Sequence, residues 1–578
     1  MRSQRSSKRE SHVEIFELGG PSFFPIDPSP PPMVITETDR TRDADSLSLS
    51  SVESCVPNTR FVAGHSFFNY AQLGSLRPGY GSVNLFGTGY CGLTVQFFVC
   101  GFAFYFCSYG FGRILAEYVS GYSSRQAEAV NYVLSWPQCF VVLIGLISDA
   151  KSLWGHRRKS YMILGGLIST FFFVVIVILD IFAASNHAVG MSSVRAGSQS
   201  SSPDTYVVPF LILSLMASFG IQISWVTAVA YSVELAQREP LRRRGLIQGI
   251  LVGVYCLGGA FAELLTSQLL VKHEDHVQSR LSLGSAAGVL ACVCASSVPC
   301  ARWFIQEDTV YTLRDTPAAS IKRRGSDFWR FCSQNLVYRV MFFVVGHMFL
   351  LALYNINARD AVEKWSHVSF EDSLLILVGR RFAKVFGAVW WAYYLKNYNW
   401  RRLAAYGSFI FIIPNVLVTT LTAFDVVRSK WLYGVCVSFG DISRAWLLIY
   451  VAILPTEITT AGQEGVVAGM CISFQILSGL ASLTVSTLLP GISALAVSDD
   501  DVMNDDKSTR MTVFLATMMC VGINLLCLLT VPLLPHQKLD AQQLRAFGGY
   551  NGCARTVLLV GFVLLLVFNF AANIVVVV

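Results

Sequence analysis

Long apolar runs recur along this chain from residue 84 onwards, separated by short polar segments. Each run is about 20 residues long, which is the length that an α-helix needs to cross the hydrocarbon core of a bilayer. Because backbone groups in lipid must be hydrogen-bonded within their own segment, we predict that every run is a helix. The predicted spans are 84–108, 127–148, 160–183, 206–233, 246–270, 281–303, 335–356, 371–395, 403–424, 430–455, 465–490 and 510–534, and the apolar run at 555–578 could be a thirteenth.

Positive charge gathers in alternate loops between these spans. Lys and Arg are concentrated after even-numbered spans, whereas the loops after odd-numbered spans are Ser-rich or acidic, as at 184–203 and 498–506. Loops rich in Lys and Arg stay in the cytoplasm, so we predict that the N-terminus is cytoplasmic and that a thirteenth span would end outside. The basic loops are 151–159, 238–244, 321–325 and 396–402.

The composition agrees with a membrane protein. The 578 residues are 53% hydrophobic and 14% charged, with a mean hydropathy of +0.51, whereas soluble domains carry roughly 25% charged residues. We therefore predict an all-α polytopic membrane protein. The net charge of +7 is spread over short loops, which suits a surface of anionic lipid better than nucleic acid. The fifteen cysteines are scattered without a CxxC pair, so we interpret them as small apolar residues and expect no metal site.

The chain divides into five predicted parts. Residues 1–80 are rich in Ser, Pro and charge, which is typical of a disordered tail, and we expect no cleaved signal peptide. The spans then form two six-helix bundles, 81–303 and 335–534, joined by a long cytoplasmic loop at 304–334. Residues 535–578 form a cytoplasmic linker and the extra C-terminal helix. The motif WGHRR in the first bundle is weakly echoed by YNWRR in the second, which suits internal duplication but equally suits coincidence.

Charged residues inside the predicted spans are the strongest candidates for function. A charge at the centre of a span costs at least about 2.5–3.5 kcal/mol on insertion scales, so it should face a cavity or a partner. The span 371–395 contains Arg380, Arg381 and Lys384, which helical spacing places close together. A basic cluster with few compensating acids predicts a cavity for an anionic substrate, because guanidinium groups bind carboxylates through two hydrogen bonds. If the boundaries are misplaced, these arginines would instead reach an interface.

Other spans carry further candidates. Asp441 and Arg444 lie three residues apart in one predicted span and could be either part of a substrate site or a structural ion pair. Glu263 is a candidate proton site, and Trp225 could stack on a flat ring. The sequence has no P-loop, HExxH or suitable GxSxG motif. We therefore expect no enzyme and no cofactor, and the energy source should be an ion gradient or none.

The segment GLISDAKSLWGHRRKSYMILGG, residues 145–166, resembles the loop between helices 2 and 3 of major-facilitator transporters. An acid ends one apolar run, and a cluster of cations precedes the next. The resemblance implies that these residues latch the cytoplasmic side without touching substrate. A carboxylate and a guanidinium in a half-wet interface can pair in one state and separate in the other. The residues of this gating motif are Gly145, Asp149, Gly155, Arg157, Arg158 and Lys159.

Three further segments make the chain similar to one branch, the folate–biopterin transporter family. They are AQREPLRRRGLIQG at 236–249, LPTEITTAGQEGVVAGM at 454–470 and QQLRAFGGYN at 542–551. The resemblance covers most of residues 84–578 and implies about twelve helices, alternating access, and uptake of pterins or folates by proton symport. Its matching residues are Glu239, Arg244, Gly245, Gln248, Gly462 and Glu464.

The chain also departs from this family. Members usually carry a lysine near the position of Val141 and acids near those of Trp225 and Val229, and here these positions are uncharged. The expected function is a secondary transporter of a pterin, a folate or a similar anionic heteroaromatic solute. The alternatives are a facilitator of a different organic solute and a transport-inactive receptor or scaffold. We expect a monomer in the lipid bilayer, in the plasma membrane rather than an organelle, with a small-molecule substrate and no nucleic acid.

Overall fold

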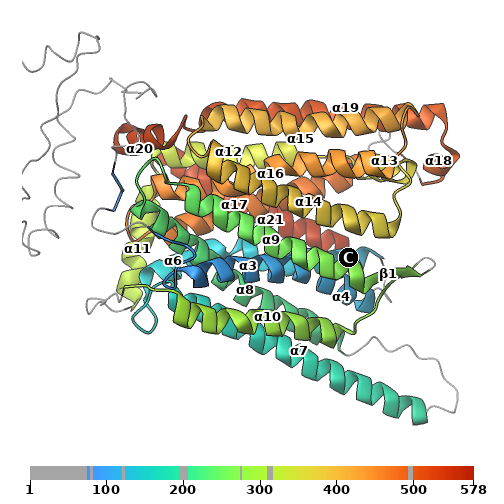
Figure 1. Ribbon diagram of the computed structural model, residues 1–578, viewed down its shortest axis with the longest axis horizontal. Helices are drawn as coiled ribbons and strands as arrows, with labels where there is room; N and C mark the ends of the chain where they lie inside the picture. The colour runs from blue at the N-terminus through green and yellow to red at the C-terminus, as the bar shows by residue number, and fades with distance from the viewer. Residues whose placement is uncertain are drawn as a thin grey trace, which may run out of the picture. The chain divides into compact units, whose positions relative to one another are not determined.

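The computed structural model describes residues 74–77, 83–119, 124–193, 206–273, 276–308, 317–491, 497 and 499–577, so most of the predicted tail lies outside the described residues. Long helices run side by side (Figure 1). The first half of the chain forms α3 (Cys91–Tyr105), the π-helix η2 (Phe106–Phe111), α4 (Gly112–Val119), α5 (Ser124–Cys139), α6 (Val141–Ala150), α7 (Lys159–Ser193), α8 (Val207–Arg238), α9 (Leu246–Leu269), the antiparallel hairpin β1 (Leu270–His273) and β2 (His276–Ser279), and α10 (Leu283–Phe304).

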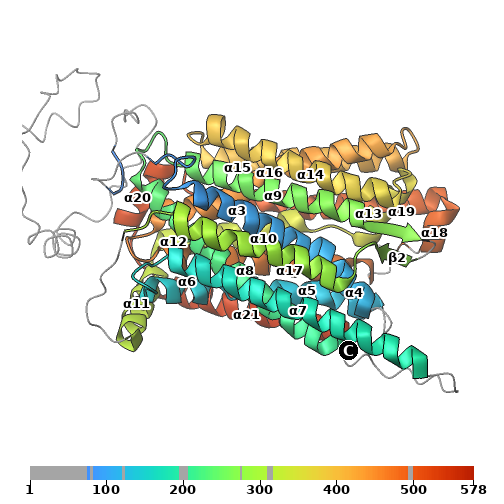
Figure 2. The same cartoon turned by 60° about the horizontal axis from the view of Figure 1, so that its bottom comes forward.

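The second half follows the connecting helix α11 (Pro317–Phe331). It comprises α12 (Asn335–Ala352), α13 (Ile356–Trp365), α14 (Phe370–Trp390), the π-helix η3 (Trp391–Leu395), α15 (Trp400–Ala423), α16 (Lys430–Ile458), α17 (Glu464–Leu488), the 3-10 helix η4 (Leu489–Gly491), α18 (Asp499–Asn504), α19 (Lys507–Leu525), the 3-10 helix η6 (Leu526–Leu533), α20 (Lys538–Phe547) and α21 (Gly552–Val577). We call the end of the bundle where α11 and α20 lie the basic end, and the opposite end, near β1 and α18, the hairpin end (Figures 1 and 2).

The predicted all-α membrane protein is confirmed. Among the described residues, 11 helices are long and apolar enough to cross a membrane, and α5 with α6, bent by 40°, makes a twelfth. Pro137 lies one turn before this bend and leaves a backbone carbonyl without its helical donor. The helix α14, at the predicted span 371–395, is not among these twelve, and it carries the charged residues Arg380, Arg381 and Lys384. It nevertheless packs against α9 and α16 in the bundle. The predicted run at 555–578 is the helix α21.

Several predicted boundaries were wrong. The first span begins at Cys91 and not at residue 84, because Gly87 and Gly89 lie in tight turns, and it continues into α4 beyond residue 108. The helix α7 extends to Ser193, ten residues past the predicted end. The segment predicted as the loop 304–334 contains the amphipathic helix α11, which apolar-run reasoning overlooks because only one face is apolar.

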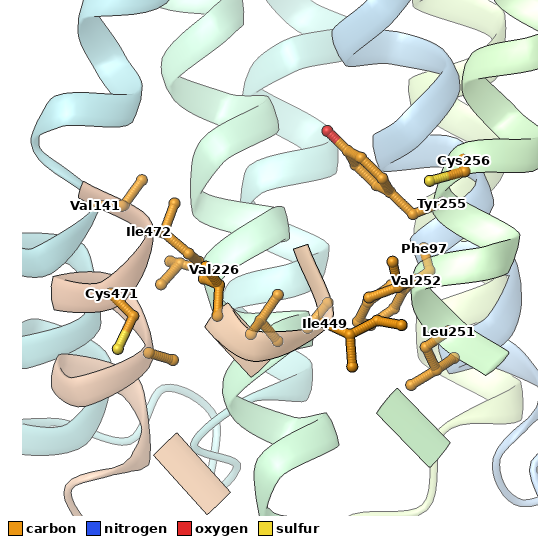
Figure 3. Packing of buried hydrophobic residues seen from close by; sticks show 14 of the residues in the cluster. Phe97, Val141, Val226, Leu251, Val252, Tyr255, Cys256, Ile449, Cys471 and Ile472 are labelled. Carbon is orange, nitrogen blue, oxygen red and sulfur yellow. The ribbon is translucent and has the colours of Figure 1, made fainter. Parts of the chain in front are cut away.

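The apolar core crosses the seam between the two halves. Figure 3 shows Phe97 and Val252, from the first half, in the same cluster as Ile449 and Ile472, from the second. The extra helix α21 covers another part of the seam, since it packs on both α5 and α17. The amide of Asn569 donates to the carbonyl of Leu477 at 3.1 Å. A helix that contacts both halves must accommodate any movement between them.

Glycines bring α3 and α9 into backbone contact. A Cβ atom at Gly101 would lie 2.1 Å from the carbonyl oxygen of Tyr255, and one at Gly258 would lie 2.2 Å from that of Phe98. Small residues at helix crossings allow this close approach, which is a common way to pack helices in membranes.

We predict that Gly258→Val destabilises the protein, because the new side chain would force α3 and α9 apart. Overpacking a tight contact costs about 1–3 kcal/mol. The control is Gly479→Val, on α17, where a Cβ atom would meet nothing within 4 Å. Thermal unfolding in detergent should show a lower Tm for Gly258→Val alone, and equal Tm values for the two variants would refute the close packing.

Candidate functional site

The predicted gating motif lies at the basic end and joins the two halves. The guanidinium group of Arg158 is fully buried and contacts three carboxylates. Its Nη2 lies 2.5 Å from Asp149 Oδ1 and 2.9 Å from Glu464 Oε2, and its Nε lies 3.2 Å from Glu234 Oε1. Glu464 belongs to the second half, and the other residues belong to the first. Sequence reasoning missed Glu234, because it lies one residue past the predicted end of its span.

The carboxylate of Asp149 also caps a helix of the opposite half. It accepts hydrogen bonds from the backbone N–H groups of Gly465 at 3.1 Å and Val466 at 2.7 Å, in the first turn of α17. These N–H groups have no partner within the helix, and an acid near them is favoured by the helix dipole. A Cβ atom at Gly145 would lie 2.1 Å from the carbonyl oxygen of Gly465. Gly145 therefore allows the backbones of α6 and α17 to come into direct contact.

The rest of the motif orders the loop before α7. Gly155 has a φ of +78°, which a side chain would strain. The carboxylate of Glu307 accepts from the backbone N–H groups of Arg157, Arg158 and Lys159, and the Lys159 ammonium donates to a backbone carbonyl at 2.8 Å. The side chain of Arg157 donates to Asp149 at 3.3 Å.

A second connection between the halves is formed by residues of the segments 236–249 and 454–470. The guanidinium group of Arg244 lies 3.0 Å from Glu457, and the amide of Gln248 donates to Thr456 at 2.8 Å. Lys538 donates to the carbonyl of Arg244 at 2.5 Å, which adds α20 to this contact. We call these ion pairs and those of Arg158 the latch. Gly245 and Gly462 provide the left-handed turns beside it, with φ of +99° and +90°.

The predicted charges within the spans form a cluster on α14 and α16. Arg380 Nε lies 2.5 Å from Asp441 Oδ2, while Lys384 Nζ and Arg444 Nε lie 3.8 and 3.6 Å from Asp441 Oδ1. Among the described residues, these three cations pair with no other carboxylate, so the cluster has a formal charge of +2. Asp441 Oδ1 is buried and has no hydrogen-bond partner. The predicted pair of Asp441 with Arg444 is present, but Arg380 is the closer partner.

Arg381 points away from this cluster toward the first half. Its Nη2 lies 3.1 Å from Glu263 Oε1. The guanidinium carbon lies 4.0 Å from the centre of the Tyr105 ring and 5.4 Å from that of Tyr109. Glu263, predicted as a proton site, is thus the partner of a buried cation.

Two cavities lie near these charges. The outer cavity, toward the hairpin end, has a volume of about 470 Å³ and is lined by Arg380, Arg444 and two arginines that the sequence did not single out, Arg113 and Arg359. The side chain of Arg444 is 33% exposed. Arg113 and Arg359 were overlooked because both fell outside the predicted spans, in segments that form α4 and α13.

The central cavity lies between the halves and has a volume of about 140 Å³. Its lining has no Asp, Glu, Lys or Arg. The predicted residue Trp225 lines it and packs against Tyr255, with ring centres 4.4 Å apart. Trp225 therefore belongs to a different compartment from the arginine cluster. Within the described part of the chain, no group of three or more His, Cys, Asp or Glu side chains could hold a metal ion.

Burial perturbs Glu239 beside the latch. It raises the pKa of the Glu239 carboxyl from 4.5 to about 7, although the cations Lys538 and Lys396 oppose the shift. Burial also lowers the pKa of the Lys538 ammonium to about 7, against the effect of Glu457. The contribution of Glu239 to stability is fully present below its unfolded pKa of 4.5 and is lost as pH rises through about 7.

We predict that Glu239→Gln becomes more stable relative to the unaltered protein as pH rises from about 5 to about 8. The amide cannot ionise, so the variant avoids burying a charge, and the difference should reach at most about 3 kcal/mol. Glu239 also raises the pKa of the Lys538 ammonium, so the difference reports on this pair of neighbouring groups. Thermal unfolding at several pH values measures it, and a difference that stays constant with pH would contradict the raised pKa.

Comparison with known proteins gives both a partial family match and similar structures. Residues 129–356, less than half of the chain, match the PUCC protein family, and no curated protein matches the sequence. The crystal structure of the human organic anion transporter MFSD10 has a TM-score of 0.51 at 12% identity, covering 76% of this chain and 98% of that one.

Two further similar structures are sugar transporters. The D-xylose-proton symporter has a TM-score of 0.49 at 14% identity, covering 76% of this chain and 96% of its own. The proton:xylose symporter XylE, of the major facilitator superfamily, has a TM-score of 0.49 at 13% identity, covering 75% of this chain and 94% of its own. The arrangement of helices and the match to the human transporter agree that this chain has the major-facilitator fold.

Proposed function

We propose that the protein is a secondary transporter that carries an organic anion by alternating access. The observation that carries this proposal is the cluster in which Arg380, Lys384 and Arg444 share the one carboxylate of Asp441 beside the outer cavity. An uncompensated charge within a membrane span is costly, so it is kept where it serves a ligand. An anion in the cavity would neutralise the excess charge.

The latch favours alternating access over a static scaffold. Loops rich in Lys and Arg lie at the basic end, which the positive-inside rule assigns to the cytoplasm. With the latch closed, the halves meet on the cytoplasmic side, and the outer cavity lies toward the opposite side. This is the arrangement of a carrier that receives solute from outside. A scaffold would need neither the cavity nor separable charge pairs.

The outer cavity suits an anion with a flat ring. Its volume of about 470 Å³ lies within the range of small-molecule sites, about 300–1,000 Å³. Arg359 lies over the ring of Tyr354 and Arg444 over that of Phe411, at 5.2 and 4.6 Å, so the lining offers planar surfaces beside cations. The human structure with this fold is of an organic anion transporter, so the fold is compatible with such cargo.

A pterin or folate remains the first candidate, as the family resemblance implies. Its negative charge would, however, bind at other positions than those at which that family usually has charged residues. Trp225 and Val229, where that family usually has acids, line the uncharged central cavity. Of the charged residues that line the outer cavity, Arg359, Arg380 and Arg444 lie in the second half and Arg113 lies in the first. We therefore propose that an anionic heteroaromatic solute binds at the Asp441 cluster, and a facilitator of a different organic anion fits the same chemistry.

Asp441 is also the candidate for proton coupling. Neutralising its carboxylate would raise the formal charge of the cluster from +2 to +3 and strengthen its attraction for an anion. A proton and an anion would then bind cooperatively, as symport requires. The three cations oppose protonation of Asp441 while the cavity holds no anion, so Oδ1, which has no hydrogen-bond partner, would take the proton once an anion has bound.

We predict that Arg380→Gln lowers uptake of the transported anion at least tenfold while leaving the amount of protein at the membrane unchanged. The change removes the cation closest to Asp441, so the cluster loses half of its net charge. The control is Arg402→Gln, an exposed arginine near the start of α15. Uptake by proteoliposomes measures the effect, and normal uptake by Arg380→Gln would refute the assignment.

We predict that Asp149→Asn slows turnover about tenfold and changes solute binding less than about threefold. The residue lines neither cavity and makes contacts that exist only while the latch is closed, so its loss alters the exchange between states. The control is Asp308→Asn, also at the basic end, whose side chain is 77% exposed. Weakened binding at an unchanged turnover would show that Asp149 is not part of the gate.

A further inference from the structure

The outer and central cavities approach each other along α3 and η2. Tyr105 lines the central cavity and Tyr109, one turn later, lines the outer cavity. The two rings are stacked with centres 6.2 Å apart, and the guanidinium group of Arg381 lies over both. Glu263, from α9, holds Arg381 in place at 3.1 Å. We call these four residues the partition.

The chain around the partition has an irregular backbone. The segment Phe106–Phe111, which carries Tyr109, is a π-helix, and π-helical turns inside α-helices are frequent at functional sites. A Cβ atom at Gly259 would lie 2.3 Å from the Tyr105 ring, so this glycine makes room for the ring. The ion pair joins α9 of the first half to α14 of the second, and relative movement of the halves would therefore disturb it.

The central cavity offers unused hydrogen-bonding groups. The amide side chains of Gln138, Gln222 and Gln475 line it, and none has a hydrogen-bond partner among the described residues. Gln138 is 4% exposed and Gln222 is 2% exposed. Buried amides without partners are costly unless water or a ligand satisfies them. Trp225 and Tyr255 add aromatic faces to the same lining.

We propose that the central cavity is an inner compartment of the solute path, which takes an uncharged, hydrogen-bonding ring and is separated from the outer cavity by the Arg381–Glu263 partition. The ligand class rests on the proposed function, since the anionic group of the same solute would stay near the Asp441 cluster. At about 140 Å³ the central cavity is smaller than a drug-sized site, so the partition must part before the ring enters.

Two native cysteines test the partition without any knowledge of the solute. Cys100 lines the central cavity and Cys520 lines the outer one. The purified full-length protein in detergent is treated with a negatively charged methanethiosulfonate reagent, and peptide mass spectrometry follows each thiol. Rates are divided by those of the unfolded protein. We expect Cys520 to react at least tenfold faster than Cys100, and equal rates would overturn the proposal.

Opening the partition should raise the reaction rate of the Cys100 thiol and leave that of the Cys520 thiol unchanged. Glu263→Gln removes the partner of Arg381, and Tyr109→Ala removes one ring without leaving a charge unpaired, so at least one variant should fold. Each folded variant should raise the rate at Cys100 at least tenfold and leave Cys520 unchanged. The control is Glu371→Gln, an exposed carboxylate on α14. Continued protection of Cys100 in a folded variant would overturn the partition.

The ligand class has a separate test. Proteoliposome uptake is compared for two anions that share the anionic group, one with a hydrogen-bonding ring and one with a plain aromatic ring. Gln222→Leu should reduce the preference for the first at least fivefold, and an unchanged preference would overturn the inner compartment. If neither anion is transported, the proposed function and this ligand class fail, whereas the thiol result still decides whether the partition exists.

Discussion

A buried charge requires an opposite charge beside it, and this protein uses that requirement to join its halves. Arg158 with Glu464 and Arg244 with Glu457 connect the halves at the basic end, and Arg381 with Glu263 connects them beside the rings of Tyr105 and Tyr109. Removing one partner of such a pair leaves an uncompensated charge, at a cost of about 3–5 kcal/mol. The same pairs, separated together and hydrated, allow a second arrangement of the halves. They therefore stabilise this state without fixing it permanently.

The Asp441 cluster differs from these connections because all its members lie within the second half. Its cations outnumber its carboxylates, and an outer cavity of about 470 Å³ lies beside it. The cluster is therefore not needed to hold the halves together and is available to a ligand. The central cavity has the opposite character, with amides and aromatic rings and no formal charge in its lining. This separation of charge from hydrogen-bonding rings underlies the proposed preference for an anion that carries a ring.

Much of the fold was predictable because span length and loop charge are properties of the sequence itself. The acid and cations of residues 149–159 lie close together in the structure, and the short loop that joins them favours this. Their partner Glu464 lies more than 300 residues away, so no local pattern could pair it with Arg158. Arg113 and Arg359 were missed because apolar runs do not reveal helices of mixed polarity. The separation of Trp225 from the cations likewise depends on how the halves pack, which periodicity does not report.

The most direct test of the central account is a transport panel in cells that lack their own carriers. Labelled folate, biopterin and other organic anions are compared with uncharged and cationic analogues of similar size, each at two external pH values. We predict that anions accumulate, faster at the lower pH, while their uncharged analogues do not. Uptake of an uncharged or cationic analogue at the same rate as its anion would contradict the role assigned to the Asp441 cluster.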